Sequence, residues 1–195
     1  MRYAISISLL VFQVALLIIS AQRIQCSQVH PMEERDHEDD GDDQGTELIE
    51  RTCKRTPHYE LCTSTLEASP ESSSADLRGL AHIMVDQVLS KATETLEFIR
   101  SLLKEEPDPD LEKALAYCAE LYIPVVKYSL PQAIDALTGG HFGFANYGIS
   151  DAAKQANACD KNFSKSTDSP LADKNTLLND LSEVAAAIIG ILLKG

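Results

Sequence analysis

The chain has 195 residues, of which 30 are acidic and 17 basic, and its formal net charge is −13. This length suits one domain with short appendages, and a hydrophobic content of 44% is enough for a packed core, which excludes a wholly disordered protein. Because the chain is acidic and has no cluster of Lys and Arg, nucleic acid and anionic lipid surfaces are excluded as partners.

Residues 1–26 have the three-part layout of a secretory signal peptide. Arg2 supplies a positive charge, a mainly apolar run extends from Ala4 to Ile19, and the small residues Ser20 and Ala21 favour cleavage nearby. The apolar run is about 16 residues long, short for a bilayer span, which needs roughly 20. We therefore expect a secreted protein with no stable membrane association after cleavage. An uncleaved signal anchor is the alternative.

An acidic segment, residues 27–46, follows the signal peptide. Residues 33–50 carry a net charge of −9, whereas residues 51–195 carry only −6. Like charges repel, and the segment has little apolar surface to bury, so we predict a disordered linker here. The folded domain is predicted over residues 47–195.

Secretion decides how the five cysteines are interpreted, because disulfides persist outside the cytosol. Cys26 lies near the cleavage region, where it is either removed or retained as an odd thiol. The other four allow three pairings. Cys53 and Cys62 are nine residues apart, which suits a bridge across a short hairpin, and Cys118 and Cys159 would then join distant elements. Zinc binding is the competing use, but the chain has no CxxC pair and no Cys–His cluster, so we predict disulfides and no metal.

Apolar residues in the rest of the chain recur at steps of three or four, the spacing of amphipathic helices. The spacing predicts one long helix over residues 75–104, with Asp76 near its start. A second helix is predicted over residues 111–137, and Pro124 and Pro131 should kink or split it.

Two further helices are predicted, over residues 149–163 and 178–192. Residues 139–148, between the second and third helices, contain four glycines and are predicted to form a loop. The last apolar run, Val184 to Leu193, also resembles a GPI-anchor tail. Its helical register and the terminal Lys194 favour a core helix instead.

Four helices with short loops and no β alternation predict an all-α fold, an antiparallel up-down four-helix bundle. Residues 48–66, which contain the first cysteine pair, should form a short helical hairpin before the bundle. Together with the cysteines, this arrangement predicts a small domain cross-linked by two disulfides.

The sequence carries no recognised catalytic motif: no G-x-S-x-G, no H-E-x-x-H and no Gly-rich phosphate loop. Residues 105–110 include carboxylates of the kind used in acid–base pairs, but their prolines favour a solvated loop. Asn162-Phe163-Ser164 is a glycosylation sequon, which requires Phe163 to face the core while Asn162 faces out. We therefore predict a binding protein without a cofactor, and not an enzyme.

Three motifs together resemble the plant invertase and pectin methylesterase inhibitor family. Residues 53–62, CKRTPHYELC, are similar to the family's opening cysteine pair. Residues 114–122, ALAYCAELY, are similar to its Leu-x-x-Cys-x-Glu-x-Tyr helix, and residues 149–159, ISDAAKQANAC, to the helix with its fourth cysteine. The resemblance covers residues 47–195. It implies a four-helix bundle with an N-terminal helical hairpin and the bridges Cys53–Cys62 and Cys118–Cys159, the pairing that the spacing also favours.

The resemblance further implies a protein that binds a secreted carbohydrate-active enzyme, one to one, and obstructs its substrate cleft. Pectin methylesterase of the plant cell wall is the first expectation, because a mildly acidic domain suits a basic enzyme. Acid invertase is the alternative target. We expect the protein in the apoplast and cell wall, and an invertase target would add the vacuole. Invertase inhibitors of the family share a Pro-Lys-Phe turn before the third bundle helix, and here Phe142-Gly143-Phe144 lacks the Pro and Lys. Residues 150–152, Ser-Asp-Ala, look more like the invertase inhibitors.

Contacts with the target are expected in the predicted loop, where the candidates are His141, Phe142, Phe144 and Asn146. The alternative is that Phe142 and Phe144 cap the bundle core. Weaker candidates are carboxylates of the first long helix, which usually form only a solvated face: Asp86, Glu94 and Glu97. Two other functions stay open, a carrier of small apolar ligands, which needs a cavity, and a storage or allergen-like protein without a specific target.

Overall fold

The structure, a computed structural model, describes residues 40–163 and 169–195; the predicted signal peptide and residues 27–39 lie outside these ranges. Every regular element of the described part is helical. The elements are α2 (Asp40–Cys53), α3 (Tyr59–Glu67), the 3₁₀ turn η1 (Pro70–Ser74), α4 (Leu77–Lys104), α5 (Pro109–Pro124), the π-helical segment η2 (Val125–Ser129), α6 (Leu130–Thr138), α7 (Phe142–Asn162) and α8 (Ala172–Lys194).

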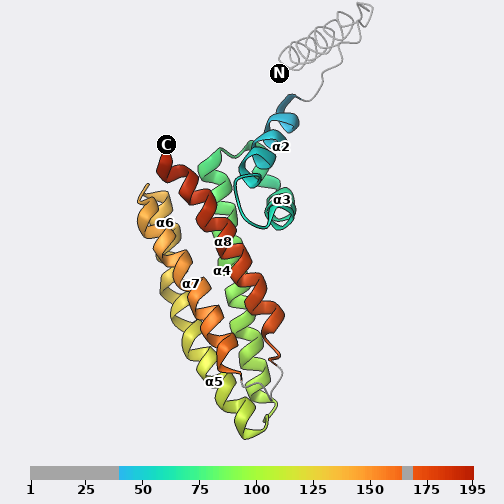
Figure 1. Cartoon of the computed structure of the whole chain (residues 1–195), viewed down its shortest axis with the longest axis vertical. Helices are drawn as coiled ribbons and strands as arrows, with labels where there is room; N and C mark the ends of the chain where they lie inside the picture. Colours follow the sequence, from blue (N-terminus) through green and yellow to red (C-terminus); the bar gives the residue numbers. More distant parts are fainter. Residues whose placement is uncertain (1–39, 164–168) are drawn as a thin grey trace, which may run out of the picture. The chain divides into compact units, whose positions relative to one another are not determined.

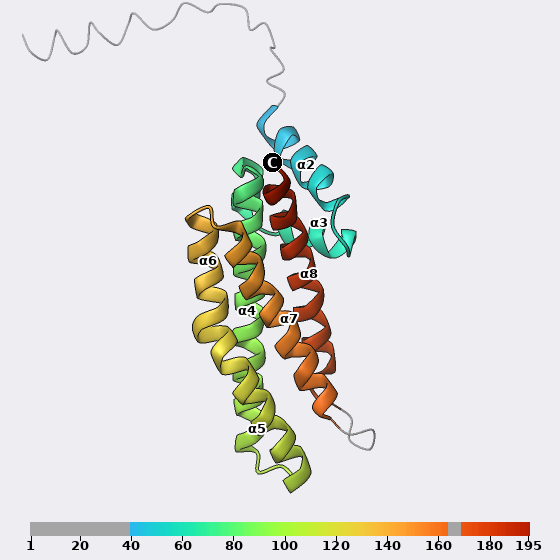
Figure 2. The same ribbon diagram turned by 60° about the vertical axis from the view of Figure 1, so that its left-hand side comes forward.

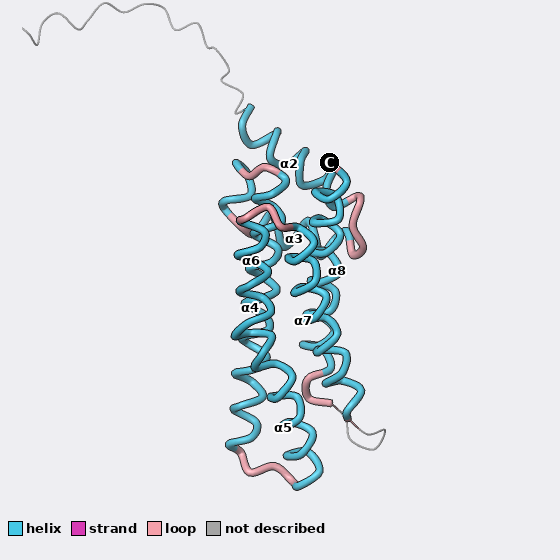
Figure 3. The backbone as a smooth tube through the Cα atoms, turned by 90° about the vertical axis from the view of Figure 1, so that its left-hand side faces the viewer, coloured by secondary structure: helices cyan, strands magenta, loops and turns pink. Residues whose placement is uncertain are grey.

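Four long helical segments pack as an antiparallel bundle. α4, the continuous segment α5–η2–α6, α7 and α8 alternate in direction along the chain (Figures 1 and 2). α7 packs against α8, α5 and α6, while α4 packs against α8, α5 and α6. Figure 3 shows that the connections gather at the ends of the helices. The predicted all-α, up-down bundle is confirmed.

Helix α4 forms where the apolar spacing predicts it. Leu80 and Met84, four residues apart, are fully buried on its inner face. Asp76 caps the helix, because its Oδ1 accepts a hydrogen bond of 2.8 Å from the Gly79 amide. Lys104 in the last turn complements the negative end of the helix dipole. Local sequence signals therefore fix both ends of this helix.

Two prolines divide the second bundle segment, as predicted. Neither Pro124 nor Pro131 has an amide hydrogen, so each leaves a carbonyl of the preceding turn without its helical donor. Between them the helix widens into η2, where the Leu130 amide donates to the Val125 carbonyl five residues earlier. The helical segment thus continues through both prolines and stays packed in the bundle.

Residues 139–148 are not the loop that the sequence predicts. α7 begins at Phe142, and only Gly139-Gly140-His141 connects it to α6. One of the glycines reflects helix packing, because a Cβ atom on Gly148 would lie 2.5 Å from the Ser129 carbonyl oxygen. A glycine is needed there to bring two backbones together, and not to allow a turn.

Helix α2 begins at Asp40, inside the segment predicted as a disordered linker. That prediction is wrong for residues 40–46, because packing outweighs the repulsion among the acidic residues. A Cβ atom on Gly45 would lie 2.5 Å from the Ser73 carbonyl oxygen of η1, so the two segments are in close contact. One turn later Ile49 is buried in the core.

The N-terminal hairpin of α2 and α3 is present as predicted. The Cys53–Cys62 bridge ties the end of α2 to α3, with the two Cα atoms 5.6 Å apart. His58, in the connection between them, points to two carboxylates of α8. Its Nε2 lies 3.1 Å from Glu183 Oε2 and 3.6 Å from Asp180 Oδ1. The hairpin therefore contacts the bundle through polar groups as well as through its core residues.

The second bridge, Cys118–Cys159, joins α5 to α7 with a Cα–Cα distance of 4.9 Å. A buried polar network lies beside it. The Tyr122 hydroxyl donates to Asn175 Oδ1 at 2.6 Å, and Asn175 Nδ2 donates to Cys159 Sγ at 3.4 Å. Burial raises the pKa of Tyr122 well above its ordinary value. Helices α5, α7 and α8 thus meet at one desolvated, hydrogen-bonded point.

Helix α8 contributes one face to the core of the bundle. It buries Leu178, Leu181 and Ile188 and packs against α7 and α4. By length and composition alone it could also cross a membrane, a test that core helices of soluble proteins pass as well. Its packing supports the core-helix interpretation over the GPI-anchor tail.

Replacing Gly148 by Ala should destabilise the protein by about 1–3 kcal/mol, because the new methyl group meets the Ser129 backbone and not a movable side chain. The matched control is Gly143→Ala on the same helix, where a Cβ atom would have no neighbour within 4 Å. Alanine there should leave stability unchanged or raise it by up to about 1 kcal/mol. Urea denaturation measures both. Equal effects of the two substitutions would contradict the close approach at Gly148.

Stability should fall as the pH rises above about 10, to an extent that Tyr122→Phe reduces. Since the pKa of Tyr122 is raised in the folded state, the unfolded chain releases this proton first. The contribution of Tyr122 is therefore complete below about pH 10 and is lost progressively above it.

At neutral pH the same substitution should cost about 1–3 kcal/mol, because the buried Asn175 oxygen loses its donor. Urea denaturation of both proteins at pH 7 and at about pH 10.5 tests this account. An identical pH dependence in the two proteins would show that the hydroxyl is not buried as described.

Candidate functional site

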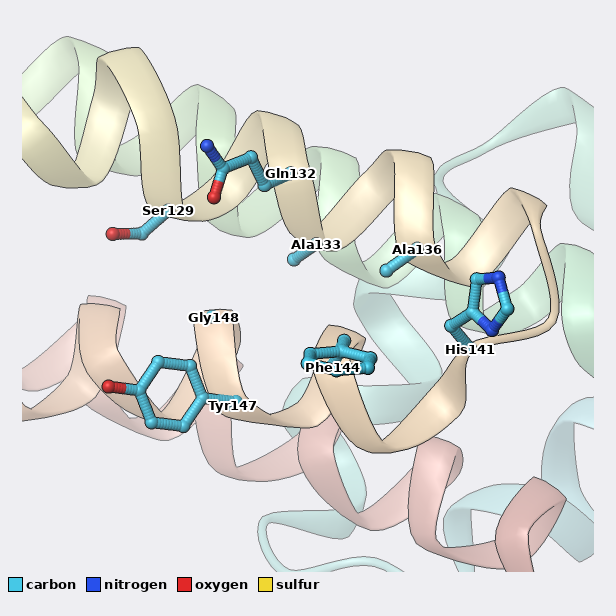
Figure 4. Close-up of a pocket in the computed structure, with 8 residues that line it drawn as sticks. All are labelled: Ser129, Gln132, Ala133, Ala136, His141, Phe144, Tyr147 and Gly148. Atoms are coloured by element: carbon cyan, nitrogen blue, oxygen red, sulfur yellow. The ribbon is translucent and has the colours of Figure 1, made fainter.

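The described residues hold no group of three or more His, Cys, Asp or Glu side chains placed to bind a metal ion. A groove of about 340 Å³ opens between α6 and α7, beside the turn that joins them (Figure 4). Its lining comes from η2, α6, the turn between α6 and α7, and the start of α7: Ser129, Gln132, Ala133, Ala136, His141, Phe144, Tyr147 and Gly148. No Lys, Arg, Asp or Glu belongs to this lining, so the groove offers aromatic and hydrogen-bonding contacts.

Small residues make the groove possible. Ala133 and Gly148 are buried between the two helices, and a Cβ atom on Gly148 would lie 3.0 Å from that of Ala133. Ser129 and Gln132 lie along the α6 side, and the aromatic side chains lie along the α7 side (Figure 4). The result is a shallow groove with one polar edge and one aromatic edge.

The aromatic edge is unusually open to solvent. Phe144 is 77% exposed and Tyr147 is 73% exposed, the highest values among the large hydrophobic residues of the described part. They are three residues apart on α7 and therefore lie on one face of the helix. Neither ring is needed by the core, so the folded chain alone does not explain why they are aromatic.

The structure separates the four residues predicted in the supposed loop. His141 and Phe144 line the groove. Phe142 does not, because it is half-buried with the Arg78 guanidinium 5.3 Å from its ring centre, as the capping alternative anticipates. Asn146 is also half-buried, and its Oδ1 receives no hydrogen bond within the described residues.

The three carboxylates predicted on α4 lie outside the groove. Lys91 Nζ lies within 3.0 Å of both Glu94 oxygens, and its hydrogen bond lowers the pKa of Glu94. Partial desolvation raises the pKa of Asp86, and the nearby Glu71 adds to the shift. Glu97 is exposed on the same helix. These groups form a charged face of α4 and are not part of one site with His141 and Phe144.

Sequence reasoning missed Tyr147, Gln132 and Ser129. The sequence predicts a loop at Tyr147, and only a helix puts this residue on the same face as Phe144. The signal that could have revealed the site is the helical spacing of Phe144 and Tyr147, two aromatic residues outside the apolar pattern of the core. Gln132 and Ser129 carry no local signal, since only the packing of α6 on α7 brings them to the groove.

The predicted glycosylation site lies at the end of α7. Asn162 is exposed, and Phe163 is half-buried against the core, the orientation that the sequon requires. Ser164, its third residue, lies outside the described residues.

Known proteins are similar to this chain in sequence and in fold. Residues 47–188 match the family described as plant invertase/pectin methylesterase inhibitor. The chain is 38% identical to the "Cell wall / vacuolar inhibitor of fructosidase 1" of Arabidopsis thaliana, over 72% of this chain and 67% of that protein. It is 32% identical to a "Pectinesterase inhibitor" of Actinidia deliciosa, over 74% of this chain and 79% of that protein.

Solved structures agree with the observed fold. A mutant form of a pectin methylesterase inhibitor from Arabidopsis aligns with a TM-score of 0.63, covering 71% of this chain and 93% of that one. Its identity is 24%, so it is similar in fold alone. With the family match over residues 47–188 and two relatives above 30% identity, the chain belongs to the plant invertase/pectin methylesterase inhibitor family.

Proposed function

We propose that this protein inhibits a secreted plant carbohydrate-active enzyme by docking the α6–α7 groove against it and obstructing its substrate cleft. The observation that carries the proposal is the exposed pair Phe144 and Tyr147 beside that groove. Binding energy at protein interfaces concentrates in a few residues, and aromatic side chains are prominent among them. Two rings held on a helix lose little conformational entropy when they are buried by a partner.

The rigidity of the site supports an inhibitor that binds without rearrangement. Both sides of the groove lie on helices of one bundle, and the Cys118–Cys159 bridge joins α5 to α7. A surface that is already in its binding shape spends less free energy on ordering than a flexible loop does. We propose a one-to-one complex, as the resemblance to the inhibitor family implies.

Pectin methylesterase and acid invertase are the two candidate targets, and each has an observation in its favour. The domain is acidic, which favours encounter with a basic pectin methylesterase, and the turn before α7 lacks the Lys of the invertase inhibitors. The 38% identity to a fructosidase inhibitor favours invertase. The groove lining is uncharged, so an effect of charge on encounter would come from groups outside the groove. Among the carboxylates of α4, Asp86 and Glu97 are exposed, and Glu94 is paired with Lys91.

The remaining parts of the proposal follow from the family. Relatives are named as cell wall or vacuolar inhibitors, which supports secretion of this chain to the cell wall and, for an invertase target, to the vacuole. We propose that the protein does not itself catalyse a reaction. The alternative of an apolar-ligand carrier gains no support, because the core side chains form one contiguous packed cluster.

Replacing both Phe144 and Tyr147 by Ala should raise the inhibition constant about 30-fold or more, the loss of roughly 2 kcal/mol expected for a central aromatic pair. The measurement is a titration of a pectin methylesterase and an acid invertase in parallel, with the unaltered chain inhibiting one of them at near-equimolar ratio.

The control is Tyr117→Ala on α5, which removes an exposed tyrosine away from the groove and should leave inhibition unchanged. Inhibition that survives the double substitution would rule out this groove as the docking surface. If the unaltered chain inhibits neither enzyme, the proposed function is wrong.

A further inference from the structure

A hydrogen-bonded clamp links the two sides of the groove. The Ser129 hydroxyl, at the end of η2, donates to Asp151 Oδ2 of α7 at 2.8 Å. The other carboxylate oxygen, Asp151 Oδ1, accepts a hydrogen bond from Gln155 Nε2 at 3.0 Å. Each oxygen of this half-buried carboxylate therefore accepts a hydrogen bond from within the protein.

The clamp contacts η2, the part of the α5–η2–α6 segment with the fewest regular helical hydrogen bonds. η2 lies between Pro124 and Pro131, each of which removes a helical donor, and its hydrogen bonds span five residues. Such segments depend on tertiary contacts for a defined geometry. Ser129 contacts α7 in two ways: its hydroxyl makes the clamp, and its backbone carbonyl is closely approached by Gly148.

The position of η2 sets the shape of the groove. Ser129 lines it, and Gln132 and Ala133 follow within the next turn of α6. Gln132 is exposed, and its side chain makes no hydrogen bond within the described residues, so the side-chain amide is available to a partner. A displacement of η2 relative to α7 would move this polar edge away from Phe144 and Tyr147.

We propose that Asp151 is a positioning residue for the docking groove: through Ser129 it holds η2 in register with α7, and thereby keeps the polar and aromatic edges at the separation that the target enzyme requires. A hydrogen bond to a carboxylate is stronger than one between neutral groups, so the single Ser129–Asp151 bond is suited to hold η2 against α7. This role rests on the proposed function and adds to it a residue that need not touch the target.

The test compares Ser129→Ala, Asp151→Ala, the double variant and the milder Asp151→Asn, which keeps one acceptor oxygen. The matched control is Asp160→Ala, an exposed carboxylate on the same helix. Two quantities are measured on the full chain: amide hydrogen exchange of residues 125–130 by NMR, and the inhibition constant against the enzyme that the unaltered chain inhibits. The thermal midpoint confirms that each variant is folded.

We expect Ser129→Ala and Asp151→Ala each to speed exchange in η2 at least about tenfold and to weaken inhibition by a similar factor. The double variant should be no worse than either single one, because both remove the same contact. Asp151→Asn should lie between Asp151→Ala and the unaltered chain, and Asp160→Ala should change neither quantity.

Unchanged exchange in η2 would overturn the clamp. Faster exchange with unchanged inhibition would leave Asp151 a purely structural residue and would overturn its positioning role. If the unaltered chain inhibits neither enzyme, the proposed function fails and the positioning role fails with it, while the exchange rates still decide separately whether Asp151 holds η2.

Discussion

The close antiparallel packing of α7 against α5–η2–α6 is the constraint on which the rest of the structure depends. It is fixed at one end by the Cys118–Cys159 bridge, with Cα atoms 4.9 Å apart, and farther along by Gly148 against the Ser129 carbonyl. A covalent bond and a backbone contact leave little freedom for sliding. The groove beyond Gly148 therefore has a defined shape before any partner arrives, which lowers the ordering cost of binding.

Much of the fold could be predicted because its signals are local or covalent. The spacing of apolar residues and the Asp76 cap mark α4, and the two prolines mark the division of the second segment. Two segments could not be predicted. Glycines in residues 139–148 and acidic residues in 40–46 both favour loops locally. Residues 142–148 and 40–46 are nevertheless helical, because Gly148 and Gly45 each contact a distant backbone. Local propensity loses to tertiary packing at these places.

The site was harder to predict than the fold, because it combines residues from two helices. His141 and Phe144 were found from their position before the third helix, while Tyr147 and Gln132 needed the packing of α6 on α7. Asn146 is close to these residues in sequence, but it is not part of the groove lining. Charges on α4 proved uninformative about the groove, since a solvated helix face and a binding face look the same in one sequence.

We infer that the α6–α7 end of the bundle docks against the target enzyme. The most direct test is hydrogen exchange of the chain, free and in complex with the enzyme that it inhibits, followed peptide by peptide. The account predicts protection concentrated in residues 129–148, with α2, α3 and the exposed face of α8 unchanged. Protection confined to the N-terminal hairpin or to α4, with residues 129–148 exchanging as in the free chain, would contradict it.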